Sequence, residues 1–316
     1  MKERRKELLP IACVLLALIA PAHANDKLTV LLDWFVNPNH GPLIVAQAIG
    51  AFQRQGLDVE FVEPADPSMP PLLVAAGRGD IAIGYQPQLY QQVAQGLQLA
   101  RIGVLIDRPM ETLETLEPSG IKTIGDLKGK RVGYNNVGGD VNLADIAQML
   151  STAGLKLTDV TLVNIGTALT TSLLTGQVDA VGVDRNFETF ELIEHGAKPR
   201  GFDYEAYGVP DFDYLIMIVQ KSRAHDPAMA RFLRAVQEGV AYIRAHPDQA
   251  WADFVKLYPN DDNALNLSAW RFTIGCFAVD PFSLDVKKYD RFADFLRARG
   301  VIPVALPVGA YAVALK

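Results

Sequence analysis

Segment 33–41, DWFVNPNHG, places an indole, two carboxamides and an imidazole side by side next to a proline. Trp34 offers a flat apolar surface, and Asn37, Asn39 and His40 offer directed hydrogen-bond donors and acceptors. This combination suits a planar polar heterocycle as a ligand. The structural alternative is that Trp34 fills a core and that Asn37 to Asn39 form an ordinary turn.

Segment 134–140, YNNVGGD, is a second candidate binding loop. Tyr134 opens it, and Gly138 and Gly139 could present backbone N–H groups to an oxygen or an anion at the start of a helix. No Lys-Ser/Thr pair follows the glycines, so the loop is not a P-loop. Capping of the helix by Asp140 is an equally good interpretation.

Segment 184–188, DRNFE, places Asn186 and Glu188 at the start of a predicted helix. Glu188 could accept a hydrogen bond from an amino group of a ligand, or it could simply interact with the helix dipole. Tyr85 and Tyr214 are further candidates for stacking on a ligand ring, with packing in the core as the alternative.

Enzyme motifs are absent from the chain. It contains no GxSxG, HExxH or CxxC sequence, and its five His residues show no metal-ligand spacing. Asp80 and Asp179 occupy matching turns, which favours local capping over an acid–base pair. We therefore expect a protein that binds without catalysis and needs no cofactor or metal.

The elements that must position these loops occur twice. The chain contains the same order of segments twice: an apolar run, a polar loop, a helical stretch, and a Gly-Leu pair that leads into a strand. The two Gly-Leu pairs begin at residues 56 and 154. A Gly-x-x-Asp turn before a strand recurs in the same way, at residues 77 and 176. This repeat predicts two matching β-α-β-α-β lobes, each with a parallel sheet. In open parallel sheets, ligands bind beyond the carboxyl ends of the strands.

The fold class is therefore predicted as α/β with two lobes, each a mainly parallel sheet flanked by helices, and with the ligand cleft between them. Helices are expected over 226–245 and 285–299, where apolar residues recur at spacings of three and four. We expect residues 25–115 plus 216–316 to form lobe one and 116–215 to form lobe two. The crossings near 111–119 and 211–217 would act as hinges.

The N-terminal segment 1–24 reads as a cleavable secretory signal. Basic residues precede an apolar run at 8–20, and Ala22-His23-Ala24 gives a small-x-small site before Asn25. The whole chain carries a formal net charge of -6, and no basic stripe marks a nucleic-acid surface. We expect a monomeric periplasmic protein that begins at Asn25 and binds no nucleic acid.

Four stretches resemble a known family: LDWFVNPNHGPLIVAQAIG, GRGDIAIGY, IKTIGDLKGKRVGY and VGVDRNFE. The chain resembles periplasmic substrate-binding proteins of ABC transporters, in the branch related to thiamine-pyrimidine synthases. The resemblance implies a type II binding-protein fold and an ABC permease as partner. It also implies an aminopyrimidine ligand, N-formyl-4-amino-5-aminomethyl-2-methylpyrimidine or similar, held by Trp34, Asn39, His40, Asn186 and Glu188.

Two alternatives stay open. The ligand of a binding protein could instead be riboflavin or a sulfonate, although a sulfonate would seek Arg, and the candidate loops offer only Arg185. A function of another class would be that of the related synthase, which carries a Cys-rich motif and consumes pyridoxal phosphate and one of its own His residues. A single Cys276 in the comparable segment and the export signal both disfavour synthesis.

Overall fold

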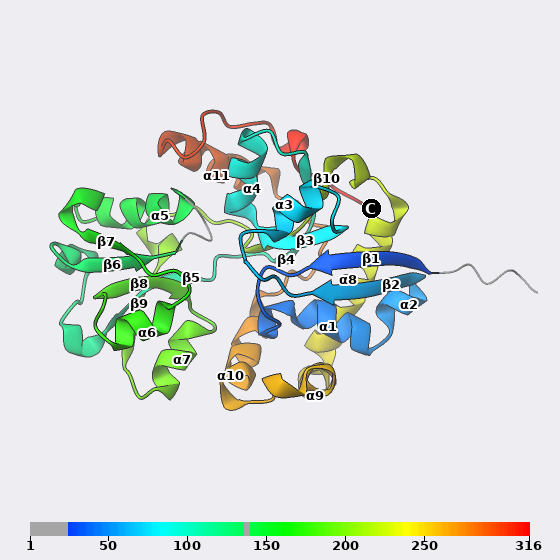
Figure 1. Ribbon diagram of the computed structural model, residues 1–316, viewed down its shortest axis with the longest axis horizontal. Coiled ribbons are helices and arrows are strands. Elements are labelled where there is room, and N and C mark those ends of the chain that lie inside the picture. Colours follow the sequence, from blue (N-terminus) through cyan, green and yellow to red (C-terminus); the bar gives the residue numbers. More distant parts are fainter. Residues whose placement is uncertain (1–24, 136–139) are drawn as a thin grey trace, which may run out of the picture.

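The computed structural model describes residues 25–135 and 140–316, which form two lobes side by side (Figure 1). The predicted signal and the two candidate glycines Gly138 and Gly139 lie outside the described residues. Each lobe is built on one five-stranded sheet. No helix among the described residues has the length and apolarity needed to span a membrane.

Lobe one contains the sheet β2-β1-β3-β10-β4. Strands β1, β2 and β3 are parallel, and the reversed strand β10 joins β3 to β4. The strand bounds are β1 Asp26–Leu31, β2 Leu57–Val62, β3 Ile81–Tyr85, β4 Leu99–Ile106 and β10 Leu215–Gln220. β4 is buried along its whole length, as expected for a strand covered on both faces.

Lobe two repeats this plan with the order β7-β6-β8-β5-β9, again with one reversed strand, β5. The bounds are β5 Glu111–Leu116, β6 Arg131–Tyr134, β7 Thr161–Asn164, β8 Ala180–Asp184 and β9 Pro199–Asp203. The Gly-Leu pairs match as predicted, because Gly56 and Gly154 both have positive φ, 68° and 71°, where glycine ends a helix at low cost. The predicted two-lobe α/β fold is confirmed.

The turns around Asp80 and Asp179 show the internal repeat in hydrogen bonds. Asp80 Oδ2 accepts from the Thr29 N–H at 2.7 Å, and Asp179 Oδ2 accepts from the Arg131 N–H at 2.8 Å. In each lobe the aspartate N–H also donates back to the carbonyl of the same partner. Both carboxylates additionally pair with an arginine. The interpretation of these aspartates as turn caps is thus in agreement with the structure.

The two connections between the lobes lie close to the predicted positions but are shifted toward the N-terminus. β5 pairs with β8 and β9 in the second sheet, so the first crossing comprises residues 107–110 and precedes the predicted 111–119. The second crossing, 208–214, ends where β10 begins at Leu215, inside the predicted 211–217. The sequence ETLETL has too many polar residues to indicate a buried strand, yet Thr112 and Glu114 are buried there.

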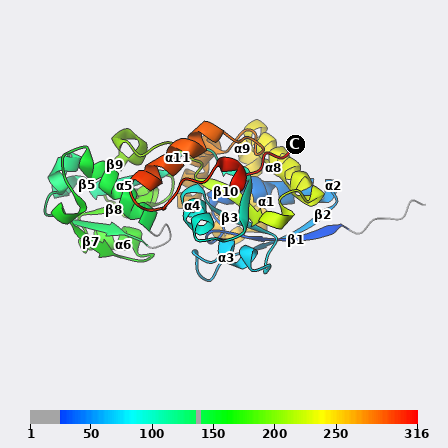
Figure 2. The ribbon, with the colours of Figure 1, turned by 90° about the horizontal axis from the view of Figure 1, so that it is seen from above.

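Helices cover both sheets, and the C-terminal ones cover lobe one (Figure 2). α8 begins after Asp226, whose side chain accepts from the Ala228 N–H at 2.9 Å, and α11 begins in the same way after Asp285. Both helices therefore match the predicted segments. The helix bounds are α1 Gly41–Ala48, α2 Ala51–Arg54, α3 Pro70–Ala75, α4 Gln86–Ala94, α5 Asp140–Ser151, α6 Leu169–Leu174, α7 Glu188–Glu194, α8 Pro227–Ala245, α9 Pro247–Leu257, α10 Ala264–Thr273 and α11 Val286–Ala298.

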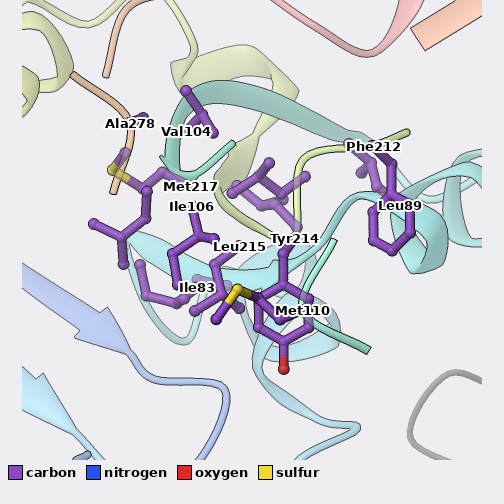
Figure 3. Packing of buried hydrophobic residues seen from close by; sticks show 14 of the residues in the cluster. Ile83, Leu89, Val104, Ile106, Met110, Phe212, Tyr214, Leu215, Met217 and Ala278 are labelled. Atoms are coloured by element: carbon purple, nitrogen blue, oxygen red, sulfur yellow. The ribbon is translucent and has the colours of Figure 1, made fainter. Parts of the chain in front are cut away.

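The core of lobe one extends to the crossing segments (Figure 3). Met110 and Phe212, one from each connection, are buried in the same cluster as Leu215 and Met217 of β10. Tyr214 belongs to this cluster through its ring, while its hydroxyl points away from the apolar side chains. The packing of the Tyr214 ring therefore fixes the orientation of its hydroxyl at the boundary between the lobes.

Candidate functional site

A cavity of about 340 Å³ lies between the lobes at the carboxyl ends of the strands. Lobe one contributes the loop after β1, the start of α4, and Tyr214. Lobe two contributes the ends of β6 and β8 and parts of α5 and α7. This is where ligands bind in open α/β sheets, and the two-lobe repeat predicted this location.

Seven of the predicted site residues line the cavity, namely Trp34, Asn37, Asn39, Tyr85, Tyr134, Glu188 and Tyr214. Phe35 follows Trp34, with the two rings edge to face at 6.1 Å, and remains 60 % exposed. Tyr85 and Tyr214 also meet edge to face, with ring centroids 5.3 Å apart. The wall therefore presents aromatic surface from both lobes, as a flat heterocycle requires.

His40 lies behind this wall and does not line the cavity. Its ring is fully buried, and its Nδ1 accepts from the Asn37 N–H at 3.3 Å. The proton therefore resides on Nε2, which donates to Asp33 Oδ1 at 2.9 Å. Asp33 Oδ2 accepts from the Tyr85 hydroxyl at 2.6 Å. His40 is thus a positioning residue for Asp33 and Tyr85, where the resemblance implied a ligand contact.

Asn37 has a mixed role. Its side chain accepts from the Asn39 N–H at 2.8 Å and donates to the Phe35 carbonyl at 2.9 Å, which shapes the turn before the short helix Pro38–His40. Both the binding interpretation and the turn interpretation therefore apply, because the residue that caps the turn also borders the cavity. These hydrogen bonds preorganise the loop, and preorganisation lowers the entropy cost of binding.

Asn186 joins the two lobes and lies outside the cavity wall. Its Nδ2 donates to Asn39 Oδ1 at 2.6 Å and to Thr273 Oγ1 at 2.8 Å, and both partners belong to lobe one. Only 1 % of Asn186 is exposed. This contact between lobes is broken if they separate, so it stabilises the closed arrangement.

We predict that Asn186→Ala shifts the unliganded protein toward an open state. Loss of two hydrogen bonds should also weaken ligand binding by about 3- to 30-fold, because a neutral hydrogen bond contributes about 1 kcal/mol. Small-angle scattering should show a larger radius of gyration for the variant. Thr189→Ala is the control, since it removes a 2.7 Å hydrogen bond to Glu114 inside lobe two. Equal radii for Asn186→Ala and the wild type would contradict the prediction.

The cavity wall is strongly acidic. Among the described residues it contains no Lys, Arg or His, and its acidic members are Asp33, Glu111, Asp145, Asp184, Glu188 and Asp261. Arg185 points elsewhere and pairs with Asp203 and Glu205. Such a wall favours ligands with N–H donors or positive charge and disfavours sulfonates and phosphates.

Burial changes the protonation of these carboxyls. It raises the pKa of Asp145 to about 8. It also raises the pKa of Asp184 and of Glu188, and for Glu188 the charge of Asp184 adds to the effect. Glu188 accepts from the Asp184 N–H at 3.0 Å, and Asp184 accepts from the Tyr214 hydroxyl. These hydrogen bonds fix both carboxyls in the wall, where burial disfavours their ionised forms until a ligand supplies donors.

Three further residues that no sequence motif indicates also line the cavity, namely Glu111, Asp145 and Tyr204. Glu111 begins the crossover strand β5, Asp145 lies in the middle of α5, and Tyr204 begins the short helix Tyr204–Tyr207. The one available signal was Asp145 itself, an acidic residue at a position where the helical periodicity requires a buried side chain.

The fold is that of periplasmic binding proteins. The alkanesulfonate-binding protein SsuA of Xanthomonas axonopodis pv. citri has a TM-score of 0.72 and 17% sequence identity, with 92% of this chain and 99% of that chain covered. At 17% identity, this similarity shows a shared fold and nothing about the ligand. The family model described as NMT1/THI5 like matches residues 37–250. The chain belongs to this family.

Relatives place the chain among proteins named for thiamine metabolism. A Haemophilus influenzae protein named for thiamine biosynthesis is 45% identical over 303 residues, covering 95% of this chain and 96% of its own length. The formylaminopyrimidine-binding protein of Halalkalibacterium halodurans is 31% identical over 230 residues, covering 72% and 69%. A Legionella pneumophila relative, 32% identical with 90% of both chains covered, is named a 4-amino-5-hydroxymethyl-2-methylpyrimidine phosphate synthase.

Proposed function

We propose that this protein is an extracytoplasmic binding protein for an aminopyrimidine precursor of thiamine, which it delivers to an ABC permease by closing its lobes. The observation that carries the proposal is the acidic, aromatic cavity, whose described residues include no basic side chain. An aminopyrimidine has a flat ring for Trp34 and N–H donors for the carboxyls. The relative named formylaminopyrimidine-binding protein supports the same ligand class.

Closure proceeds without chemistry. The ligand enters between the lobes, contacts aromatic rings on lobe one, and donates hydrogen bonds to carboxyls of lobe two. It therefore binds the closed state more tightly than the open one and shifts the population toward closure. The permease then recognises the closed shape. Residues 107–110 and 208–214 are the hinges in this proposal.

The acidic wall also separates the alternatives. Cationic side chains favour binding of a sulfonate or of the phosphate of pyridoxal phosphate, and none is present among the cavity residues that the structure describes. The synthase names of several relatives nevertheless favour that function as a second candidate. Incubation with pyridoxal phosphate and iron, followed by mass spectrometry of His40, tests it. A modified His40 would establish the synthase and refute the binding function.

The binding function is tested by calorimetry with formylaminopyrimidine and with its relatives that share the 4-aminopyrimidine ring. Glu188→Gln should weaken binding by about 10- to 100-fold, the range for a hydrogen bond to a charged group. The fold should persist, because a Gln carbonyl can still accept from the Asp184 N–H. Glu194→Gln, at the exposed end of the same helix, is the control. Failure of every aminopyrimidine to bind would refute the ligand class, and an unchanged affinity of Glu188→Gln would refute the role of Glu188.

A further inference from the structure

One end of the cavity is lined by Glu111, Asp145 and Tyr204, and we call it the acidic end. The three residues come from β5, from α5 and from the short helix after β9, all in lobe two. Only 3 % of Asp145 is exposed, and its Oδ1 has no hydrogen-bond partner among the described residues. A buried polar atom without a partner is costly, which indicates that a ligand group completes it.

The rest of the acidic end is fixed in place. Glu111 accepts from the Met110 N–H at 3.1 Å, so its carboxyl is held beside the crossing segment. The Tyr204 side chain is 2 % exposed, and its hydroxyl lies so close to Gly182 that a Cβ there would overlap it. Glycine at position 182 is therefore required for the hydroxyl to reach the cavity.

Asp145 has no basic neighbour in the part of the cavity wall that the structure describes. Burial raises the pKa of Tyr204, and the charges of Asp145 and Glu111 add to this rise. Arg299 lowers the pKa of Asp145, but burial dominates. Arg299 is itself exposed, donates to Gln148 and does not line the cavity.

We propose that the acidic end binds a positively charged group, so that the ligand is an aminopyrimidine whose side arm ends in a primary ammonium. This inference rests on the proposed function and narrows its ligand class. An ammonium offers three donors to Asp145, Glu111 and the Tyr204 oxygen. It also supplies the charge that these buried groups lack. A formyl group on the same nitrogen removes the charge and two of the donors.

The test compares three ligands that share the 4-amino-2-methylpyrimidine ring and differ at position 5. Their side arms are aminomethyl, hydroxymethyl and formylaminomethyl. By calorimetry at pH 7, the aminomethyl ligand should bind the wild type at least about 10-fold more tightly than the two neutral ligands. Its binding should also release protons, measured in buffers of different ionisation enthalpy, because Asp145 and Glu111 ionise when the cation arrives.

Asp145→Asn should lower the affinity for the aminomethyl ligand by about 10-fold or more and change the others by less than about 3-fold. It should fold, because the neutral amide resembles the protonated acid. Asp58→Asn is the matched control, with the same charge change on the exposed face of β2. Equal or tighter binding of the neutral ligands, or an equal effect of Asp145→Asn on all three, would overturn the proposal.

Failure of all three pyrimidines would refute the proposed function without deciding the acidic end. In that case, thermal shift with benzylammonium and with benzyl alcohol tests whether the acidic end binds a cation. The two probes share the benzyl group and differ in the charged group. Stabilisation by benzylammonium alone, lost in Asp145→Asn, would support the acidic end as a cation site. No difference between the two probes would overturn it.

Discussion

Replacing Trp34 with alanine should weaken binding of an aminopyrimidine by about 10- to 100-fold, since stacking of a base on an aromatic side chain contributes about 1 to 3 kcal/mol. Trp34 lines the cavity directly after β1, between the buried residues Asp33 and Val36 that anchor the loop. Val36 donates its N–H to Glu63 at 2.7 Å. The loop backbone therefore remains in place when the indole is removed.

Calorimetry with the wild type, Trp34→Ala and Trp34→Phe measures this effect, and Trp34→Phe should recover part of the affinity because it restores a flat ring. Phe35→Ala is the matched control, since Phe35 is a neighbouring aromatic residue that is 60 % exposed at the edge of the cavity. A loss of affinity in Phe35→Ala as large as in Trp34→Ala would contradict a specific stacking role for Trp34.

The unliganded protein should lose stability as the pH rises from about 5 to about 8.5. The pKa of Asp145 lies at about 8 in the folded protein, above its ordinary value near 4, because burial disfavours the carboxylate. The native state therefore binds more protons than the unfolded state across this window, and raising the pH favours unfolding. Burial raises the pKa of Glu111 and Glu188 as well, so their effects have the same sign.

Thermal unfolding at several pH values measures this change, and we expect Tm to fall by about 5 to 10 °C, given that 1 kcal/mol corresponds to about 2 to 4 °C in domains of 150–250 residues. Asp145→Asn should show a shallower fall, because an amide does not titrate. Arg131 lowers the pKa of Asp179, so this carboxylate stabilises the fold as the pH rises. Its contribution changes only below about pH 4, outside the pH range of this experiment. A Tm that stays constant or rises from pH 5 to 8.5 would contradict the prediction.

The candidate site was predictable where local sequence defined it. Trp34, Asn37 and Asn39 follow a strand in a loop that combines aromatic and polar residues, and Glu188 begins a helix after a matching strand. Because strand ends meet at one edge of a parallel sheet, these residues had to face the same space. The same reasoning placed His40 there, but its side chain turned inward to bind Asp33.

Asp145 and Asn186 show where prediction from sequence stopped. Asp145 stands in a helical stretch whose periodicity indicates a buried face, and nothing local shows that this face borders a cavity. Asn186 appeared to be a ligand contact, yet its amide pairs with Asn39, 147 residues earlier in the chain. Contacts between lobes depend on how both sheets are oriented, which no local pattern encodes.

Local sequence patterns predict the two matching lobes, the bounds of the long helices α8 and α11, and the loops that face the cleft. Periodicity, glycine turns and N-caps act over a few residues, so they can be recognised along the chain. The membership of β5 in lobe two and the convergence of Glu111, Asp145 and Tyr204 depend on tertiary packing. These features arise when distant segments pack together, and the charge of the cavity depends on that packing.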